Sequence, residues 1–311
     1  MSGAIFLFIS LAQPLKKCYN LIMKLDQECK GCLFASQLKK VEKDHPSPQK
    51  LDEFNAEVKK LCQNPPQNYC APLLMRDIDG VHRKIFGTSI DYSAEKRTFN
   101  DCLLALEDEI YARITAQDQP IKWAIKYAMA SNYIDFARLS NLDEGSVATV
   151  IDSAQKAVVD EQTFNLFLNK LKGAKSLLYL HDNCGEIVLD KILIRIIKNA
   201  FPQIEITSVV RGGEIINDAT EVDARQIDLY SHANVVQNGA NVPGTYLKEI
   251  NNRTKNLLKD ADVIISKGLG NLETLFGEGY SIFYLFMCKC NHIANAFNLP
   301  LWSTAFVYQG K

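Results

Sequence analysis

Oxygen-bearing side chains follow an apolar run in the second half of the chain. The stretch LLYLHDNCGEIVLDK, residues 177–191, changes abruptly at Asp182 and Asn183, and Glu186 follows three residues later. Carboxylate and amide oxygens are the ligands that Mg²⁺ and Mn²⁺ prefer. An Asp-Asn pair before a helix is also an ordinary N-cap. Alone, the stretch therefore permits either a metal site or a simple cap.

Two later apolar runs end in residues of related chemistry. The segment RGGEIIND, residues 211–218, supplies Arg211 and Asp218. The segment SKGLGN supplies a lysine, two glycines and an amide, namely Lys267, Gly268, Gly270 and Asn271. Phosphate groups bind backbone N–H groups at helix starts together with Lys or Arg. The three segments together favour a divalent cation that holds a phosphoryl group.

The elements that would position these residues form an alternating pattern. Apolar runs at 176–182, 204–212, 262–268 and 281–288 predict strands, and amphipathic stretches at 187–201 and 246–261 predict helices. Strands that alternate with helices indicate an α/β fold with a Rossmann-like, mainly parallel sheet flanked by helices. Ligands of such sheets bind beyond the carboxyl ends of the strands, where the three segments lie.

Residues 24 to about 170 show helical periodicity interrupted by proline-rich breaks. We expect a helical N-terminal domain at 23–170 and a Rossmann-like, metal-binding catalytic domain at 171–311. Residues 1–22 form an extra segment, in which no basic residue precedes the apolar AIFLFISLA. A cleaved secretory signal is therefore disfavoured relative to a start at Met23 or an additional packed or loose segment.

Composition excludes several classes of partner. A net charge of −1 over 311 residues argues against nucleic-acid binding, which needs clustered basic residues. No run approaches the roughly 18 apolar residues of a membrane span. An odd number of cysteines, nine, fits a reducing cytoplasm better than a disulfide framework. The sequence does not define the oligomeric state.

The cysteine pair Cys29 and Cys32 forms a C-x-x-C motif that could supply half of a tetrahedral zinc site. Cys288 and Cys290, in the sequence CKC, could complete it. The alternative interpretations are a helix-start pair of buried structural thiols and a redox pair.

Several ordered motifs resemble the damage-control phosphatases, a family once proposed to be carboxyl methyltransferases. They are HDNCGEIVLDK, VVRGGEIINDATEVDA and ISKGLGNLETL, preceded by ECKGC, DYSAEKRTFN and ASNYIDFA, which are similar to the motifs of a cysteine-containing prokaryotic subfamily. The resemblance extends from about Met23 to the C-terminus. It implies a helical bundle, a Rossmann-like domain and a divalent metal (Mn²⁺, Co²⁺, Ni²⁺ or Mg²⁺). It also implies hydrolysis of small phosphate esters, such as sugar phosphates or damaged cofactor-like compounds.

The resemblance also implies roles for individual residues. The metal ligands would be Asp182, Asn183 and Asp218, and Lys267 would bind phosphate. Asn132 and Asp135 would contact the substrate. Further substrate contacts are expected from Glu186, Arg211, Gly268, Gly270 and Asn271. The chain departs from the family at Cys184, where the usual residue is alanine, and at Ser93, where a larger residue is expected.

The expected reaction is metal-assisted phosphoryl transfer to water, with Glu186 or Asp218 handling the proton. Arg211 would contact the substrate or pair with an acid, and Asp223 is expected on a helix surface. A covalent aspartyl route is disfavoured because the second acid of a D-x-D motif is missing after the first strand. Two alternatives remain: an S-adenosylmethionine-dependent carboxyl methyltransferase, which usually has a glycine-rich loop at the first strand exit, and a non-catalytic metal-binding protein.

Overall fold

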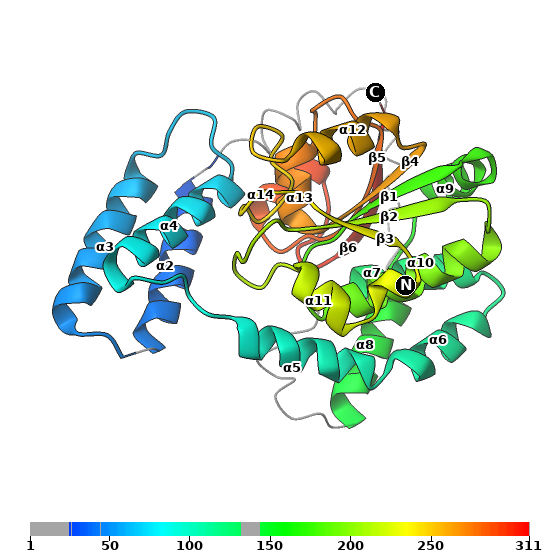
Figure 1. Ribbon diagram of the computed structural model, residues 1–311, viewed down its shortest axis with the longest axis horizontal. Coiled ribbons are helices and arrows are strands. Elements are labelled where there is room, and N and C mark those ends of the chain that lie inside the picture. Colours follow the sequence, from blue (N-terminus) through cyan, green and yellow to red (C-terminus); the bar gives the residue numbers. More distant parts are fainter. Residues whose placement is uncertain (1–24, 26, 44, 132–143, 311) are drawn as a thin grey trace, which may run out of the picture.

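The computed structural model describes residues 25, 27–43, 45–131 and 144–310, with only the backbone of residues 144–149 (Figure 1). Helices dominate the first half of the described chain. They are α2 (Gln27–Lys43), α3 (Pro48–Gln63), α4 (Ala71–Phe86), α5 (Ser93–Leu104), α6 (Glu107–Thr115), α7 (Pro120–Ala130), α8 (Glu144–Lys156) and α9 (Glu161–Gly173). This part agrees with the helical N-terminal region that the sequence predicts.

A six-stranded sheet forms the centre of the second half. Its strands are β1 (Ser176–Leu180), β2 (Glu205–Val210), β3 (Asn234–Gln237), β4 (Val263–Lys267), β5 (Ile282–Met287) and β6 (Thr304–Gln309). Their order is β3-β2-β1-β4-β5-β6, and every neighbouring pair is parallel except β5 and β6. The predicted α/β class with a mainly parallel sheet is therefore confirmed. The strand order reverses between β1 and β4, which is the topological switch point where such sheets bind ligands.

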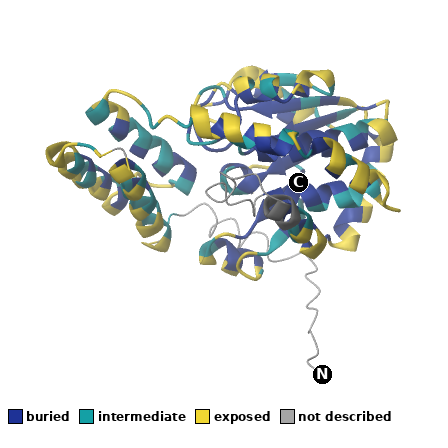
Figure 2. Cartoon of the chain, turned by 90° about the horizontal axis from the view of Figure 1, so that it is seen from below, coloured by how far each residue is buried: buried dark blue, intermediate teal, exposed yellow. Residues whose placement is uncertain are grey.

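Alternate residues of β1 belong to different cores because successive side chains point to opposite faces of a strand. Leu177 and Tyr179 pack with α6, α7, α9 and α10 (Glu186–Ala200). Leu178 and Leu180 pack on the other face with α12 (Asn252–Asp260), α13 (Gly268–Leu275) and α14 (Asn291–Phe297). Figure 2 shows the sheet as a buried layer between exposed helix faces.

Helices α2, α3 and α4 form a lobe beside the sheet, at the left of Figure 1. The lobe has its own apolar core, which includes Phe54, Val58, Leu74 and Ile78. Helices α5 to α7 instead pack along the sheet domain. The domain boundary near residue 170 stays a prediction.

Some elements differ from the predicted ones. Strands β3 and β6 were not expected, and the helix predicted from residue 246 begins only at Asn252. The Asn251 side chain accepts the Thr254 N–H at 2.8 Å and thereby caps that helix. No helix of the described chain combines the length and the apolar character needed to cross a membrane.

Candidate metal and phosphate site

We call the turns that follow β1, β2 and β4 the first, second and third strand exits. The first two are joined through their backbones at the carboxyl edge of the sheet. Asn183 and Asp218 pair in an isolated antiparallel bridge, and the Ala219 N–H donates to the Asp182 carbonyl at 2.8 Å. The predicted metal ligands Asp182, Asn183 and Asp218 therefore lie on two adjoining turns, as the sequence predicted for neighbouring strands.

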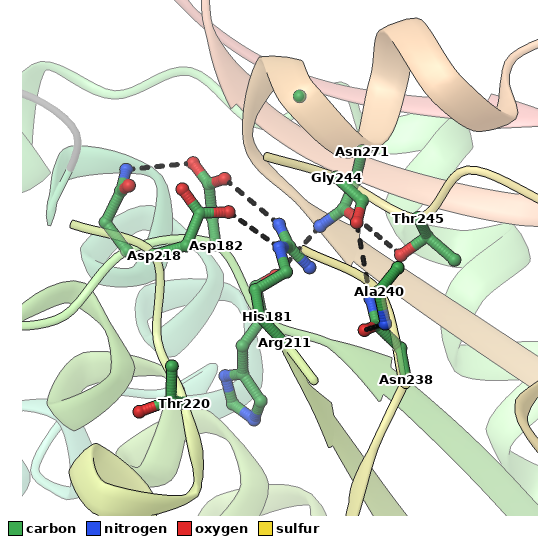
Figure 3. Close-up of polar contacts among 12 residues, drawn as sticks. His181, Asp182, Arg211, Asp218, Thr220, Asn238, Ala240, Gly244, Thr245 and Asn271 are labelled. Carbon is green, nitrogen blue, oxygen red and sulfur yellow. Dashed lines mark hydrogen bonds and ion pairs between the residues drawn. The ribbon is translucent and has the colours of Figure 1, made fainter. Parts of the chain in front are cut away.

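Arg211 reaches between the two aspartates (Figure 3). Its Nε donates to Asp218 Oδ2 at 2.6 Å, and its Nη2 lies 3.6 Å from Asp182 Oδ1. The side chain is 1% exposed, and neither Nη atom has a hydrogen-bond acceptor among the described residues. Arg211 therefore pairs with an acid, as one of its two expected roles requires, and its contact with substrate stays a prediction.

Lys267, at the end of β4, lies fully buried behind the two turns. Its Nζ is 2.9 Å from Asp190 Oδ1, 3.1 Å from Glu186 Oε2 and 3.4 Å from Ser131 Oγ. Glu186 Oε1 also accepts the Asn183 amide at 2.9 Å. Through Glu186, the lysine is therefore linked to one of the predicted metal ligands.

Asp190 was not predicted as a site residue, although it is the principal partner of Lys267. It accepts hydrogen bonds from Tyr179 Oη at 2.8 Å and His181 Nδ1 at 3.0 Å. Burial opposes its ionisation, but Lys267 and His181 outweigh that effect and lower the pKa of Asp190. Burial also opposes the charge of Lys267, yet Asp190 and Glu186 raise the pKa of this lysine, which stays cationic. The sequence signal that could have identified Asp190 is the presence of an acid within the largely apolar stretch 187–197.

The buried carboxyl groups at the exits outnumber the buried cations beside them. Burial, together with Glu186 and Asp218, raises the pKa of Asp182 well above its ordinary range. Burial also raises the pKa of Asp218, despite Arg211. Among the described residues, five buried carboxylates lie here with three buried cations: Asp182, Glu186, Asp190, Asp218 and Asp223 with Lys96, Arg211 and Lys267. A bound divalent cation would relieve this excess, so the residues present fit such an ion.

Gly268 brings the third exit against the first. A Cβ built on Gly268 would lie 1.9 Å from Asp182 Oδ2, and its φ is +77°. The Asn271 Nδ2 donates at 2.8 Å to the carbonyls of both His181 and Lys267, so Asn271 links the same two strand ends. A Cβ on Gly270 would meet the Pro243 carbonyl oxygen at 2.3 Å. The substrate contacts expected from these three residues stay predictions.

Three further residues that the sequence analysis singled out lie elsewhere or outside the described structure. Asn132 and Asp135 lie outside the described residues. Asp223 is 2% exposed and caps the short helix α11 (Glu221–Gln226), so the expected surface role is wrong. The reason is its hydrogen bonding: its Oδ2 accepts from the Thr220 N–H at 2.8 Å and its Oδ1 from the amide of Asn100 at 2.9 Å.

The described residues contain no group of three or more His, Cys, Asp or Glu side chains arranged to hold a metal ion. A cation at the exits would therefore use the Asn183 amide oxygen beside the two aspartates. Cys29 and Cys290 are half-buried and Cys32 is exposed. These cysteines form no such group in the described part of the chain, and Cys32 is exposed, whereas the structural-thiol interpretation expected buried thiols. The role of the Cys29 and Cys32 pair stays a prediction.

Comparison with known proteins identifies the family. Residues 25–301 match the family model for the damage-control phosphatase ARMT1-like domain. The chain belongs to this family, as the sequence motifs indicated. Membership supports a phosphatase role.

Individual relatives agree with this assignment. A damage-control phosphatase of Archaeoglobus fulgidus is 30% identical over 224 residues, 69% of this chain and 75% of its own. One from Pyrococcus horikoshii is 34% identical over 181 residues, 57% and 61% of the two chains. An uncharacterized protein of Methanocaldococcus jannaschii is 29% identical over 225 residues, 69% and 73%. The crystal structure of a DUF89 family protein from P. horikoshii superposes with a TM-score of 0.81 at 25% identity, covering 92% of this chain and 99% of that one.

Proposed function

We propose that the chain is a divalent-metal-dependent phosphatase that hydrolyses small phosphorylated metabolites in the cytoplasm. One observation carries the proposal: Asp182, Asn183 and Asp218 meet beyond the carboxyl ends of β1 and β2, next to the switch point of the sheet, in a cluster with excess buried carboxylate. Because the family supports a phosphatase role, we assign the hydrolysis of phosphate esters to this cluster. Sugar phosphates and damaged cofactor-like phosphates are the substrates we expect.

The proposal assigns separate tasks to the residues. The oxygens of Asp182, Asn183 and Asp218 would hold Mn²⁺, Co²⁺, Ni²⁺ or Mg²⁺. When bound, such a cation supplies Lewis-acid polarisation of a phosphoryl oxygen. Lys267 would exchange its contact with Glu186 for a phosphoryl oxygen and keep its contact with Asp190, so that its charge stabilises the transferring group. Glu186 or Asp218 would accept the proton that the attacking water loses.

The test is a phosphatase screen on sugar phosphates and phosphorylated cofactors, with and without Mn²⁺. We expect turnover that requires metal and falls about 100-fold or more in Asp182→Asn and Asp218→Asn. Asp262→Asn is the matched control, because Asp262 accepts backbone N–H groups of Lys175 and Ser176 at the amino ends of the strands. It should keep activity.

Three results would contradict the proposal. Metal-independent turnover that survives both substitutions would remove the metal site. Mn²⁺ binding without turnover of any phosphate ester would favour a metal-binding protein without catalysis. Methyl transfer from S-adenosylmethionine to a carboxylate, without phosphatase activity, would favour a methyltransferase.

A further inference from the structure

Helix α5 contributes two buried polar side chains beside the strand exits. Lys96 is 3% exposed and Asn100 is fully buried. Both belong to the motif DYSAEKRTFN, to which the sequence assigned no chemistry. The large majority of buried polar side chains make hydrogen bonds, so the partners of these two indicate what they hold in place.

Asn100 links the first exit to the second. Its Oδ1 accepts the Gly185 N–H at 2.6 Å, and its Nδ2 donates to Asp223 Oδ1 at 2.9 Å and to Gln226 Oε1 at 2.8 Å. The amide orientation follows from these partners, since the opposite orientation would place two donors together at Gly185 and two acceptors together at Asp223.

Both ends of this link lead directly to predicted metal ligands. Gly185 lies in the turn that begins with Asp182 and Asn183. On the other side, Asp223 Oδ2 accepts the Thr220 N–H at 2.8 Å, and Thr220 is two residues from Asp218. The Lys96 ammonium lies 2.8 Å from the same Asp223 oxygen and balances its buried charge.

We propose that Asn100 is a positioning residue that holds the two metal-ligand turns in register, so that a helix of the N-terminal half sets the geometry of the site. The proposal rests on the proposed function where metal affinity is concerned. Asn100 contacts neither the predicted ligand atoms nor the substrate phosphate of that mechanism. Its effect passes through the Gly185 N–H and the Asp223 carboxylate.

A donor–acceptor exchange tests this role. Asn100→Asp keeps an acceptor for Gly185 but places a second carboxylate against Asp223. Combining Asn100→Asp with Asp223→Asn reverses donor and acceptor across the pair and returns the pair to a single negative charge near Lys96. Mn²⁺ affinity of the full chain is measured by electron paramagnetic resonance, without substrate. We expect Asn100→Asp to raise the Mn²⁺ dissociation constant about 10- to 100-fold, and the double variant to recover most of the loss.

Backbone hydrogen exchange supplies a readout that needs no metal. Asn100→Asp should speed exchange in the segments 183–187 and 217–221 together, and the double variant should slow both again. Ile110→Val, in the core of α6, is the control for general destabilisation and should leave both segments and the Mn²⁺ affinity unchanged.

The two readouts separate the two proposals. A folded Asn100→Asp variant with wild-type exchange in both segments would overturn the positioning role, whatever its metal affinity. A wild-type chain that binds no Mn²⁺ would overturn the metal site of the proposed function, and coupled exchange changes at 183–187 and 217–221 would still support the positioning role.

Discussion

At the scale of single residues, Gly268 has no room for a side chain. A methyl group there would lie 1.9 Å from Asp182 Oδ2, and the φ of +77° is strained for any residue with a Cβ. Gly268→Ala should therefore lose Mn²⁺-dependent activity as well as stability, as measured by steady-state assay and urea unfolding.

Gly279→Ala separates these two effects. Gly279 has a φ of +82°, but a Cβ at this residue would meet nothing within 4 Å, so the position shares the backbone strain without the contact. We expect a loss of about 1–2 kcal/mol in the free energy of unfolding with activity retained. Equal activity in the two variants would show that Gly268 does not define the position of Asp182.

Asp190 should matter more for stability than its position in a helix suggests. Asp190→Asn leaves the buried Lys267 ammonium with one acid, so we expect a loss of about 3–5 kcal/mol in the free energy of unfolding. Activity should fall with it because the lysine loses its fixed partner. Tyr179→Phe, which removes one hydrogen bond to the same carboxylate, should cost only about 1 kcal/mol and keep activity. Similar unfolding curves for the two variants would contradict this account.

The location of the strand-exit residues at one edge of the sheet could be predicted, because polar side chains directly after apolar runs mark the ends of buried strands. Parallel strands bring Asp182 and Asp218 to one edge without further knowledge. The partners of Lys267 could not be predicted in this way. Ser131 is 136 residues away in the chain, and Asp190 lies within a helix whose sequence does not say what it faces.

At the scale of elements, Glu273 links α13 to α4 and should make stability depend on pH. Its Oε2 accepts the Ala71 N–H at the start of α4 at 3.2 Å, and burial raises its pKa from 4.5 to about 8. The neighbouring Cys70 has a pKa raised to about 12, mainly by burial, and stays a thiol. Glu273 is thus the group at this contact that titrates between pH 5 and 8.

The sign follows from the direction of the shift. A carboxyl whose pKa is higher in the folded chain stabilises that chain below pH 4.5, and the contribution is lost as the pH rises toward 8. Glu273→Gln keeps an acceptor for Ala71 and should remove this decline, on the order of 2 kcal/mol between pH 5 and 8 because water reaches part of the side chain. Urea unfolding at both pH values measures it. The exposed Glu278→Gln should follow the wild type, and a Glu273→Gln curve parallel to both would refute the assignment.

Element prediction succeeded where length and burial were typical. The runs that became β1 and β5 are apolar over four and six consecutive residues, and those that became β2 and β4 hold three apolar residues each at mostly buried positions, as strands covered on both faces require. Strand β3 is short and begins and ends in polar residues, Asn234 and Gln237, because it lies at the edge of the sheet. Strand β6 forms the other edge and pairs antiparallel, which no local pattern indicates.

At the scale of the whole molecule, helical periodicity shows that a helix has a buried face but not what covers it. The sequence therefore predicted a single helical region before residue 170. Packing divides these helices: α2 to α4 enclose their own core, whereas α7 packs on α10 beside the sheet. The division matters for function because the α2–α4 lobe meets the loop that carries Asp218.

That contact is made by Ile215 and Ile216, which line a small cavity together with Phe54, Met75 and Ile78 of the lobe. Ile215 is 3% exposed, and Ile216 has a φ of 44°, a left-handed conformation that β-branched residues rarely adopt. Both residues lie within three positions of Asp218. The lobe therefore helps to hold a strained loop in the conformation that aims this aspartate.

Ile215→Ala tests whether the lobe supports the site. Removing the buried side chain should cost about 2–5 kcal/mol and release the loop, so Mn²⁺-dependent activity should fall roughly 10- to 100-fold. Ile110→Ala makes the same truncation in α6, at a fully buried position away from the exits. It should lose similar stability and keep its activity, as measured on both folded variants below their unfolding transitions. Equal activity losses would mean that the lobe acts only through overall stability, because the loop would then hold Asp218 without the contact to Ile215.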